Sequence, residues 1–252
     1  MNIILQNKIA VITGAAAHGL GRADALALGQ SGCKIAVLDV ADLTETLALL
    51  SKEGIEAKGY RCDISDWNQV QEAVKAIVAD FGTIHILVNN ASILTTVGAI
   101  QDIPIEKWNR DIQVNLMGSA NMTRAVWPHL LSNKWGRVVF MSSIAGTRGG
   151  FGQTSYSATK AGVIGLAKSL ALEGARYNVT ANCVAPGIMQ SQAAMTMIRP
   201  DMLERMKKGI PMRRFGEVSD IANTVTFLCS EQAGYITGQV IEVDGGSGLF
   251  VV

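Results

Sequence analysis

The chain has 252 residues, of which 48% are hydrophobic and 17% are charged, and its formal net charge is +1. This size and composition fit a single domain, residues 1–252, with a large apolar core, and they exclude intrinsic disorder. The near-neutral charge argues against nucleic acid or an anionic membrane as the main partner. Because no apolar run is long enough to span a membrane and no signal peptide is recognisable, we expect a cytoplasmic protein.

Seven short apolar segments predict β-strands. Several are almost continuously apolar, such as residues 9–12 and 35–38, which is typical of strands buried on both faces of a parallel sheet. The predicted strands are Lys8–Thr13, Lys34–Val40, Glu56–Cys62, Ile84–Asn89, Arg137–Ser142, Val179–Val184 and Gln239–Val243.

Helical patterns occupy the gaps between the predicted strands. Ser65 or Asp66 is placed to cap a helix whose apolar residues recur with helical periodicity from residue 70 to residue 78. Pro104 begins a longer helix, and Ser219 is a candidate cap for Ile221–Leu228. The alternation predicts an α/β fold, a Rossmann-type doubly wound parallel sheet of about seven strands with helices on both faces.

The segment Gly187–Pro211 interrupts this regular pattern. It is long, comes late in the chain and contains Met189, Met195, Met197, Met202 and Met206. Long segments in a compact α/β chain are often lids, and methionine suits a surface that adapts to an apolar ligand. We expect a substrate-binding lid here; a helix that packs its methionines into the core is the alternative.

Cysteine and histidine patterns give no sign of a metal site. The cysteines lie far apart, in or beside apolar runs, so we expect buried reduced thiols at Cys33, Cys62, Cys183 and Cys229. Neither His-x-x-x-His nor Cys-x-x-Cys occurs, so no zinc site is expected.

Tyr156 and Lys160 are the strongest candidates for chemistry. Residues four apart lie on one face of a helix and can reach a shared ligand. A phenol has a pKa of about 10 and is a poor base at neutral pH, but a nearby ammonium stabilises the phenolate. We therefore predict that Lys160 lowers the pKa of Tyr156 enough for acid/base catalysis. The pair alone is equally consistent with a surface tyrosine and a solvated lysine.

A glycine-rich turn follows the first predicted strand and precedes an alanine-rich helix. Gly14, Gly19 and Gly21 mark this turn, which places backbone N–H groups and a helix N-terminus against a pyrophosphate. The sequence therefore predicts dinucleotide binding, with further loop contacts from Ala17, His18 and Leu20.

Asp39, at the end of the second predicted strand, bears on the choice of dinucleotide. A carboxylate there accepts hydrogen bonds from the adenosine ribose and repels a 2′-phosphate. Val40 follows it and offers no positive charge. These residues favour NAD over NADP. His18 favours the reverse, because a basic group in the glycine turn can meet a 2′-phosphate.

With these motifs, the chain resembles the short-chain dehydrogenase/reductase family over its whole length. Residues 89–92 resemble its Asn-Asn-Ala-Gly element, and Asp63 resembles the acid that meets the adenine amino group. Residues 186–187 resemble the turn that packs on the nicotinamide. The residues that match the catalytic set are Asn115, Ser143, Tyr156 and Lys160.

The resemblance implies further contacts with the cofactor and a substrate pocket. Beyond the glycine turn, the implied cofactor contacts are Asp39, Val40, Cys62, Asp63, Ile64, Asn90, Ala91, Ser92, Tyr156, Lys160, Pro186, Gly187, Met189 and Ser191. The implied substrate pocket consists of Ser143, Ile93, Leu94, Ala145, Phe151, Tyr156, Met189 and Met195.

Two departures from the family pattern occur near the cofactor. Four residues separate Gly14 from Gly19 where the family usually has three, which widens the loop. Ser92 replaces the usual glycine and adds a hydroxyl near the nicotinamide ribose. Neither departure removes a reacting group.

The resemblance also implies a role for each catalytic residue. Tyr156 exchanges a proton with the substrate oxygen, and Lys160 lowers the Tyr156 pKa and holds the nicotinamide ribose. Ser143 donates a hydrogen bond to the substrate oxygen. Asn115 holds a water that links Lys160 to solvent. Ser142 is the neighbouring alternative to Ser143, but the spacing to Tyr156 favours Ser143.

The implied pocket residues are mostly apolar, and Arg148 is the only charge in the central segment, residues 144–151. We therefore expect an NAD-dependent oxidoreductase that interconverts an uncharged secondary alcohol (alicyclic, aromatic or aliphatic) and its ketone. The main alternative is a 3-oxoacyl-thioester reductase, which would normally use NADP and a basic patch for acyl carrier protein. A non-catalytic NAD-binding sensor or scaffold is the remote alternative.

Family resemblance also implies a homotetramer or homodimer. Members of the family mostly pair through two long helices, here near Pro104–Asn133 and Gly152–Tyr177. The apolar C-terminal run, Leu249–Val252, would be exposed in a monomer, so it adds to this expectation.

Overall fold

The computed structural model describes residues 3–16, 18–190 and 200–249. Its seven-stranded sheet is parallel throughout, and its strand order is β3-β2-β1-β4-β5-β6-β7. The seven predicted strands are confirmed, with ends that differ by one or two residues. The observed strands are β1 Ile9–Thr13, β2 Lys34–Asp39, β3 Ala57–Arg61, β4 Ile86–Asn89, β5 Gly136–Met141, β6 Val179–Pro186 and β7 Val240–Val243.

The strand order reverses direction between β1 and β4, which are paired neighbours. In an open α/β sheet, a crevice forms at such a reversal, outside the carboxyl ends of the strands. The glycine turn follows β1, and residues 90–95 follow β4. The fold therefore places two predicted motifs at the mouth of this crevice.

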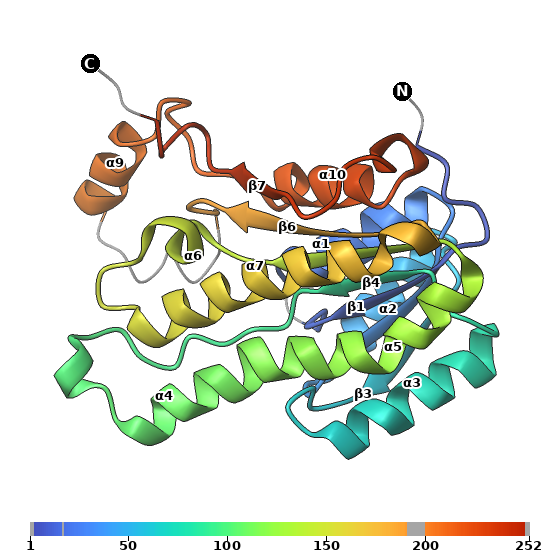
Figure 1. Cartoon of the computed structure of the whole chain (residues 1–252). Coiled ribbons are helices and arrows are strands. Elements are labelled where there is room, and N and C mark those ends of the chain that lie inside the picture. The colour runs from blue at the N-terminus through green and yellow to red at the C-terminus, as the bar shows by residue number, and fades with distance from the viewer. Residues whose placement is uncertain (1–2, 17, 191–199, 250–252) are drawn as a thin grey trace.

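Helices cover both faces of the sheet and divide the core into two apolar clusters (Figure 1). One cluster packs the sheet against α3 Trp67–Phe81, α5 Ser119–Asn133 and α7 Thr154–Gly174. The other packs it against α1 Leu20–Gln30, α2 Thr44–Lys52 and α10 Val218–Leu228. The central strands are wholly buried, as the apolar run in β1 predicts, and β5 and β6 also bury the polar residues Arg137, Thr180 and Asn182.

The long helix predicted from Pro104 is present but is not uniformly α-helical. It consists of α4 Ile105–Asp111, a π-helical segment Ile112–Gly118 and α5. π-Helical turns are rare and concentrate at functional sites. This one contains Asn115.

Two capping predictions had different outcomes. Asp66, rather than Ser65, caps α3, because its carboxylate accepts hydrogen bonds from the backbone N–H groups of Asn68 and Gln69. Ser219 as the cap of α10 was wrong. The helix begins at Val218, and the Asp220 carboxylate accepts a 2.9 Å hydrogen bond from the Glu217 N–H. An acid three residues into the helix satisfied a free N–H group at its start, so no serine cap was required.

Two further helices lie near the crevice. Helix α6 Ile144–Arg148 follows β5, and α9 Pro200–Lys208 lies within the predicted lid. Met202 is exposed on α9, whereas Met195 and Met197 lie outside the described residues. All cysteines are free and buried, as predicted. Among the described helices, none combines the length and apolarity that crossing a bilayer requires.

Candidate active site

The glycine turn requires glycine at two positions for steric reasons. Gly14 has a φ of 71°, in the left-handed region. A Cβ atom on Gly21 would lie 2.4 Å from the Gly14 carbonyl oxygen and 2.5 Å from the Asn90 side-chain nitrogen. That Asn90 nitrogen donates hydrogen bonds of 2.9 Å to the carbonyl oxygens of Thr13 and Gly14. The turn after β1 is thus held directly against the segment after β4.

Arg22 braces the same turn from within the protein. The residue is buried, and its Nε donates a 2.8 Å hydrogen bond to the Thr46 hydroxyl. Its guanidinium also bonds the Ala16 carbonyl oxygen and pairs with Glu45. The one cation immediately after the glycine turn is therefore already committed to protein groups. Of the predicted loop contacts, His18 is exposed, and Ala17 lies outside the described residues.

A cavity of about 370 Å³ opens beside this turn, at the reversal of strand order. Most of the predicted adenosine-side residues line it, together with Ile93, which was predicted for the substrate pocket, and with Leu38, Arg110 and Val114, which the sequence did not single out. The predicted residues that line it are Gly14, Leu20, Asp39, Val40, Cys62, Asp63, Ile64, Asn90, Ala91 and Ser92. The cavity walls thus come from the turn after β1 and from the ends of β2, β3 and β4.

Asp39 fits the ribose-binding role in its position and hydrogen bonding. One carboxylate oxygen accepts a 2.9 Å hydrogen bond from the Ala16 N–H, and the other accepts from the Ala41 N–H at 3.0 Å. Each oxygen retains a second lone pair for a ribose hydroxyl. The free acceptor positions on Asp39 and the closely packed glycine turn therefore fit a dinucleotide.

Asp63 is tied to protein groups at the cavity wall. It accepts hydrogen bonds from the Ser65 N–H and hydroxyl, and it pairs with Arg110 at 3.0 Å. Burial by itself would raise the pKa of Asp63, but the hydrogen bonds from Ser65 and Arg110 outweigh it and lower the pKa. Asp63 therefore stays an acceptor, and Arg110 neutralises it.

Two of the catalytic candidates, Ser143 and Tyr156, line a second cavity of about 420 Å³, whereas Asn115 and Lys160 are buried and do not line it. Tyr156 lies on α7, and Ser143 caps the start of α6, where its hydroxyl accepts from the Ala145 N–H at 3.1 Å. The cavity is lined by Ser92, Ile93, Leu94, Ser143, Ile144, Ala145, Gly149, Gly150, Gln153, Tyr156, Gly187 and Ile188. None of these residues carries a formal charge, and Ser92 and Ile93 line both cavities.

The expectation that Lys160 lowers the Tyr156 pKa is not met in this structure. Burial raises the pKa of Tyr156, and only a hydrogen bond with Ser143 works in the opposite direction. The Lys160 ammonium lies 5.4 Å from the centre of the Tyr156 ring and donates a 2.6 Å hydrogen bond to the Met141 carbonyl oxygen. The lysine here is held by the backbone of β5, and desolvation of the phenol dominates.

Lys160 itself is strongly perturbed by its surroundings. Its side chain is buried, and desolvation lowers its pKa to about 8. A lysine with this pKa exchanges its proton near neutral pH, which suits a proton relay.

The contacts of Ser142 and Ser143 show which of the two is the better candidate for the catalytic serine. Ser142 is buried, and its hydroxyl donates a 2.7 Å hydrogen bond to the Lys160 carbonyl oxygen. Ser143 lines the cavity and bonds Tyr156. The geometry therefore supports Ser143 as the residue that faces a substrate.

Asn115 clamps the segment that separates the two cavities. Its side-chain oxygen accepts from the Ile93 N–H at 2.7 Å, and its nitrogen donates to the Ile93 carbonyl oxygen at 2.8 Å. The same nitrogen lies 3.3 Å from the Thr159 hydroxyl, beside Lys160. Asn115 thus connects the wall of both cavities to helix α7.

Asp111 makes a similar connection that the sequence did not reveal. This wholly buried carboxylate accepts hydrogen bonds from the hydroxyls of Ser155 at 2.6 Å and Thr95 at 2.9 Å. Ser155 immediately precedes Tyr156, and Thr95 ends the segment that Asn115 holds. The spacing of Asp111 and Asn115 on one helix is the only signal for this role in the sequence.

Several predicted pocket residues lie elsewhere. Phe151 is fully exposed and does not line the catalytic cavity, so its assignment was wrong. Met189 forms a bridge with Gly216 and packs against it instead of lining the cavity. Met195 and Ser191 lie outside the described residues. Arg148 turns to the C-terminal segment, where it pairs with Glu242 and Asp244.

The described residues contain no group of histidine, cysteine or acidic side chains arranged to hold a metal ion.

Comparison with known proteins agrees with this geometry. Residues 14–248 match the family model described as enoyl-(acyl carrier protein) reductase. The 3-oxoacyl-[acyl-carrier-protein] reductase of Staphylococcus epidermidis is 39% identical over 95% of this chain and 98% of its own, and that of Thermotoga maritima is 38% identical over 96% and 98%.

Solved structures of similar fold include two oxidoreductases. NAD+-bound xylitol dehydrogenase has a TM-score of 0.90 at 30% identity, over 96% of this chain and 99% of the other. Levodione reductase has a TM-score of 0.92 at 30% identity, over 97% and 99%. The sequence matches, the parallel sheet and the residues at the two cavities lead to one assignment: the chain belongs to the short-chain dehydrogenase/reductase family.

Proposed function

We propose that this oxidoreductase interconverts an uncharged secondary alcohol and its ketone, with NAD as the hydride carrier. The observation that carries the proposal is the catalytic cavity, in which Ser143 and Tyr156 face apolar and neutral residues. A charged substrate would lose hydration there without gaining a partner. An alicyclic, aromatic or aliphatic alcohol of moderate size fits these walls.

The side chains at the cavity divide the work between binding and proton transfer. Bound NAD supplies hydride chemistry at the nicotinamide. Ser143 donates a hydrogen bond to the substrate oxygen, and Tyr156 exchanges the proton on that oxygen. Lys160 relays the proton and holds the nicotinamide ribose. Asn115 holds the cavity wall at Ile93 in place beside Lys160, the proton relay.

The preference for NAD rests on charge at the ribose end of the cofactor cavity. Asp39 lines the cavity, and the nearby cations Arg22 and Arg110 are already paired with Glu45 and Asp63. A 2′-phosphate at Asp39 would meet a carboxylate and no unpaired cation among the residues that line this cavity.

Reversing the charge at this position should therefore change the cofactor preference. In the double variant Asp39→Ser, Val40→Arg, we expect kcat/KM with NAD to fall and kcat/KM with NADP to rise, each by at least about tenfold. Val40 is exposed, so an arginine there can be accommodated. Steady-state kinetics with both cofactors measure the change. If the preference for NAD over NADP were unchanged, Asp39 would not be the residue that determines it.

A 3-oxoacyl-thioester reductase is the second candidate. Curated relatives at 38–39% identity carry the name 3-oxoacyl-[acyl-carrier-protein] reductase. Segment 205–214 also contains Arg205, Lys207, Lys208, Arg213 and Arg214, a positive run that suits an acidic carrier protein.

A substrate panel separates the two candidates. Rates with cyclic, aryl and aliphatic secondary alcohols are compared with the reduction of a 3-oxoacyl thioester, each with NAD(H) and NADP(H). We expect the highest kcat/KM with an uncharged alcohol and NAD. A preference for the thioester with NADPH would establish the second candidate instead, and no turnover with any pair would favour a sensor.

Assembly and a lid remain part of the proposal. Exposed apolar side chains lie on the two long helical elements, at Ile105, Met117 and Leu172, and at Leu249 near the C-terminus. These support pairing through those helices into a homodimer or homotetramer. We also propose that residues 187–211, which include helix α9, form the substrate-binding lid.

A further inference from the structure

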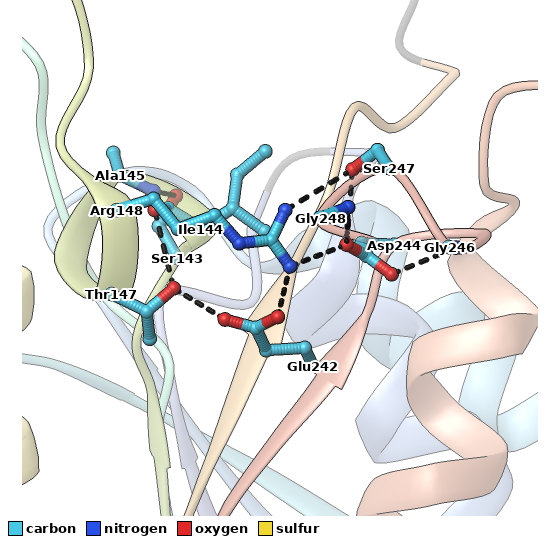
Figure 2. Close-up of polar contacts among 10 residues, drawn as sticks. All are labelled: Ser143, Ile144, Ala145, Thr147, Arg148, Glu242, Asp244, Gly246, Ser247 and Gly248. Atoms are coloured by element: carbon cyan, nitrogen blue, oxygen red, sulfur yellow. Dashed lines mark hydrogen bonds and ion pairs between the residues drawn. The ribbon is translucent and has the colours of Figure 1, made fainter. Parts of the chain in front are cut away.

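Arg148 is the centre of an ion cluster where α6 meets the C-terminal turn (Figure 2). Its guanidinium pairs with Glu242 and, at 2.7 Å, with Asp244. It also lies 3.5 Å from the Ser247 hydroxyl. On the α6 side, Thr147 donates a 2.5 Å hydrogen bond to Glu242. Residues more than ninety positions apart in the chain thus meet in one cluster.

The cluster is partly shielded from solvent and is satisfied by hydrogen bonds. The side chain of Asp244 is 8% exposed, and those of Arg148 and Glu242 are 32% and 31% exposed. Burial alone would raise the pKa of Asp244, but hydrogen bonds from Arg148, Gly246 and Ser247 outweigh it and lower the pKa. The ion pairs are therefore stronger than those of a fully exposed pair, which contribute little.

A side chain at Gly248 would displace the Arg148 guanidinium from its present position. A Cβ atom on Gly248 would lie 1.8 Å from Arg148 Cζ. The C-terminal turn is therefore fitted closely around the arginine.

Both sides of the cluster lead to the catalytic cavity. Helix α6 has only five residues and begins at its cap, Ser143, so it depends on outside contacts for its orientation. On the other side, a Cβ atom on Gly187, which lines the cavity, would lie 2.7 Å from Asp244 Cα. Asp244 is thus in close contact with one cavity wall while it binds the helix that forms another.

We propose that Arg148 is a positioning residue, which through Glu242 and Asp244 locks α6 to the C-terminal turn and so fixes the Ser143 hydroxyl against Tyr156. The proposal rests on the proposed use of Ser143 and Tyr156 in catalysis. Arg148 does not contact the substrate; it sets the angle at which α6 presents Ser143.

The first test is a double-mutant cycle between Arg148 and Ser143, with the best substrate of the panel. Arg148→Met should lower kcat at least about tenfold with little change in the KM for NAD. In a Ser143→Ala background, the same change should have almost no further effect, because the residue it positions is gone. Arg148→Lys should restore part of the loss, and Glu242→Gln should reproduce part of it. Additive losses would overturn the proposal.

A second test needs no substrate, so it is independent of the proposed reaction. In protein labelled with [ζ-13C]tyrosine, the NMR signal of Tyr156 is assigned by its loss in Tyr156→Phe. We expect Arg148→Met to shift this signal in the same direction as Ser143→Ala. An unmoved signal in a folded Arg148→Met protein would overturn the proposal; should that variant not fold, Glu242→Gln takes its place with the same criteria. A moved signal without activity on any substrate would instead contradict the proposed function.

Lys34→Met is the matched control. Lys34 pairs with Glu56 at 2.9 Å, at the opposite ends of the strands from the cavity. Removing this ion pair should leave kcat and the Tyr156 signal unchanged. If Lys34→Met matched Arg148→Met in both readouts, a general loss of stability would explain the effect and the positioning role would be refuted.

Discussion

Tyr156→Phe should lower turnover about a thousandfold or more while leaving NAD binding nearly intact. The variant removes the proton that general acid/base catalysis requires, and such catalysis contributes on the order of 10²–10⁴-fold. Tyr156 lines the catalytic cavity and not the adenosine cavity, so most cofactor contacts remain. Steady-state kinetics and NAD titration by fluorescence measure the two effects.

Tyr235→Phe provides the control for this variant. Tyr235 is fully exposed and lines neither cavity. It should retain wild-type kcat. Turnover in Tyr156→Phe equal to that of Tyr235→Phe would show that another group transfers the proton.

Asp24 should make the protein less stable as the pH rises from about 6.5 to 8. This α1 carboxyl is wholly buried, neither of its oxygens has a hydrogen-bond partner among the described residues, and desolvation raises its pKa to about 8. Between its unfolded pKa, near 4, and about 8, the folded state binds the extra proton, so the free energy of unfolding falls by about 1.4 kcal/mol per pH unit.

The pH window is set by two other groups, half-buried His85 and buried Lys160. The pKa of His85 is lowered to about 4 by burial, so its contribution changes below its unfolded value of 6.5. The pKa of Lys160 is lowered to about 8, so its contribution changes above that pH. Between pH 6.5 and 8, Asp24 should therefore remove about 2 kcal/mol of stability.

Asp24→Asn tests this assignment. The variant cannot ionise, so urea unfolding should show a flat stability over this pH window and a more stable protein at pH 8. The control is Asp102→Asn, at an exposed carboxylate, which should keep the wild-type slope. A wild-type slope in Asp24→Asn would mean that some other group binds the proton.

The strands and the placement of Tyr156 and Lys160 on one helix could be predicted because their signals are local. Continuous apolar runs such as residues 9–12 predict buried parallel strands, and each strand formed. Tyr156 and Lys160 are one helical turn apart, and both lie on α7 as expected. Ser219 failed as a cap because Asp220 supplies the hydrogen bond to the helix start.

The remaining features depend on contacts between distant segments. Asp111 meets Ser155 across 44 positions, and Arg148 meets Asp244 across 96. Nothing in the local sequence specifies such partners. The direction of the Tyr156 pKa shift could not be predicted from the sequence either, because it depends on how the whole fold buries the phenol.

The π-helical segment Ile112–Gly118 sets the rotation, about the helix axis, of both the site residue Asn115 and the core residues of α5. One extra residue in a turn rotates everything after it by about 100° relative to a continuous α-helix. Met122 and Val126, which follow on α5, are buried in the core. Deleting one residue here would regularise the helix, yet it would turn either Asn115 from Ile93 or the α5 apolar face from the sheet. A change of helical frame at this one turn would therefore disturb either the site or the core.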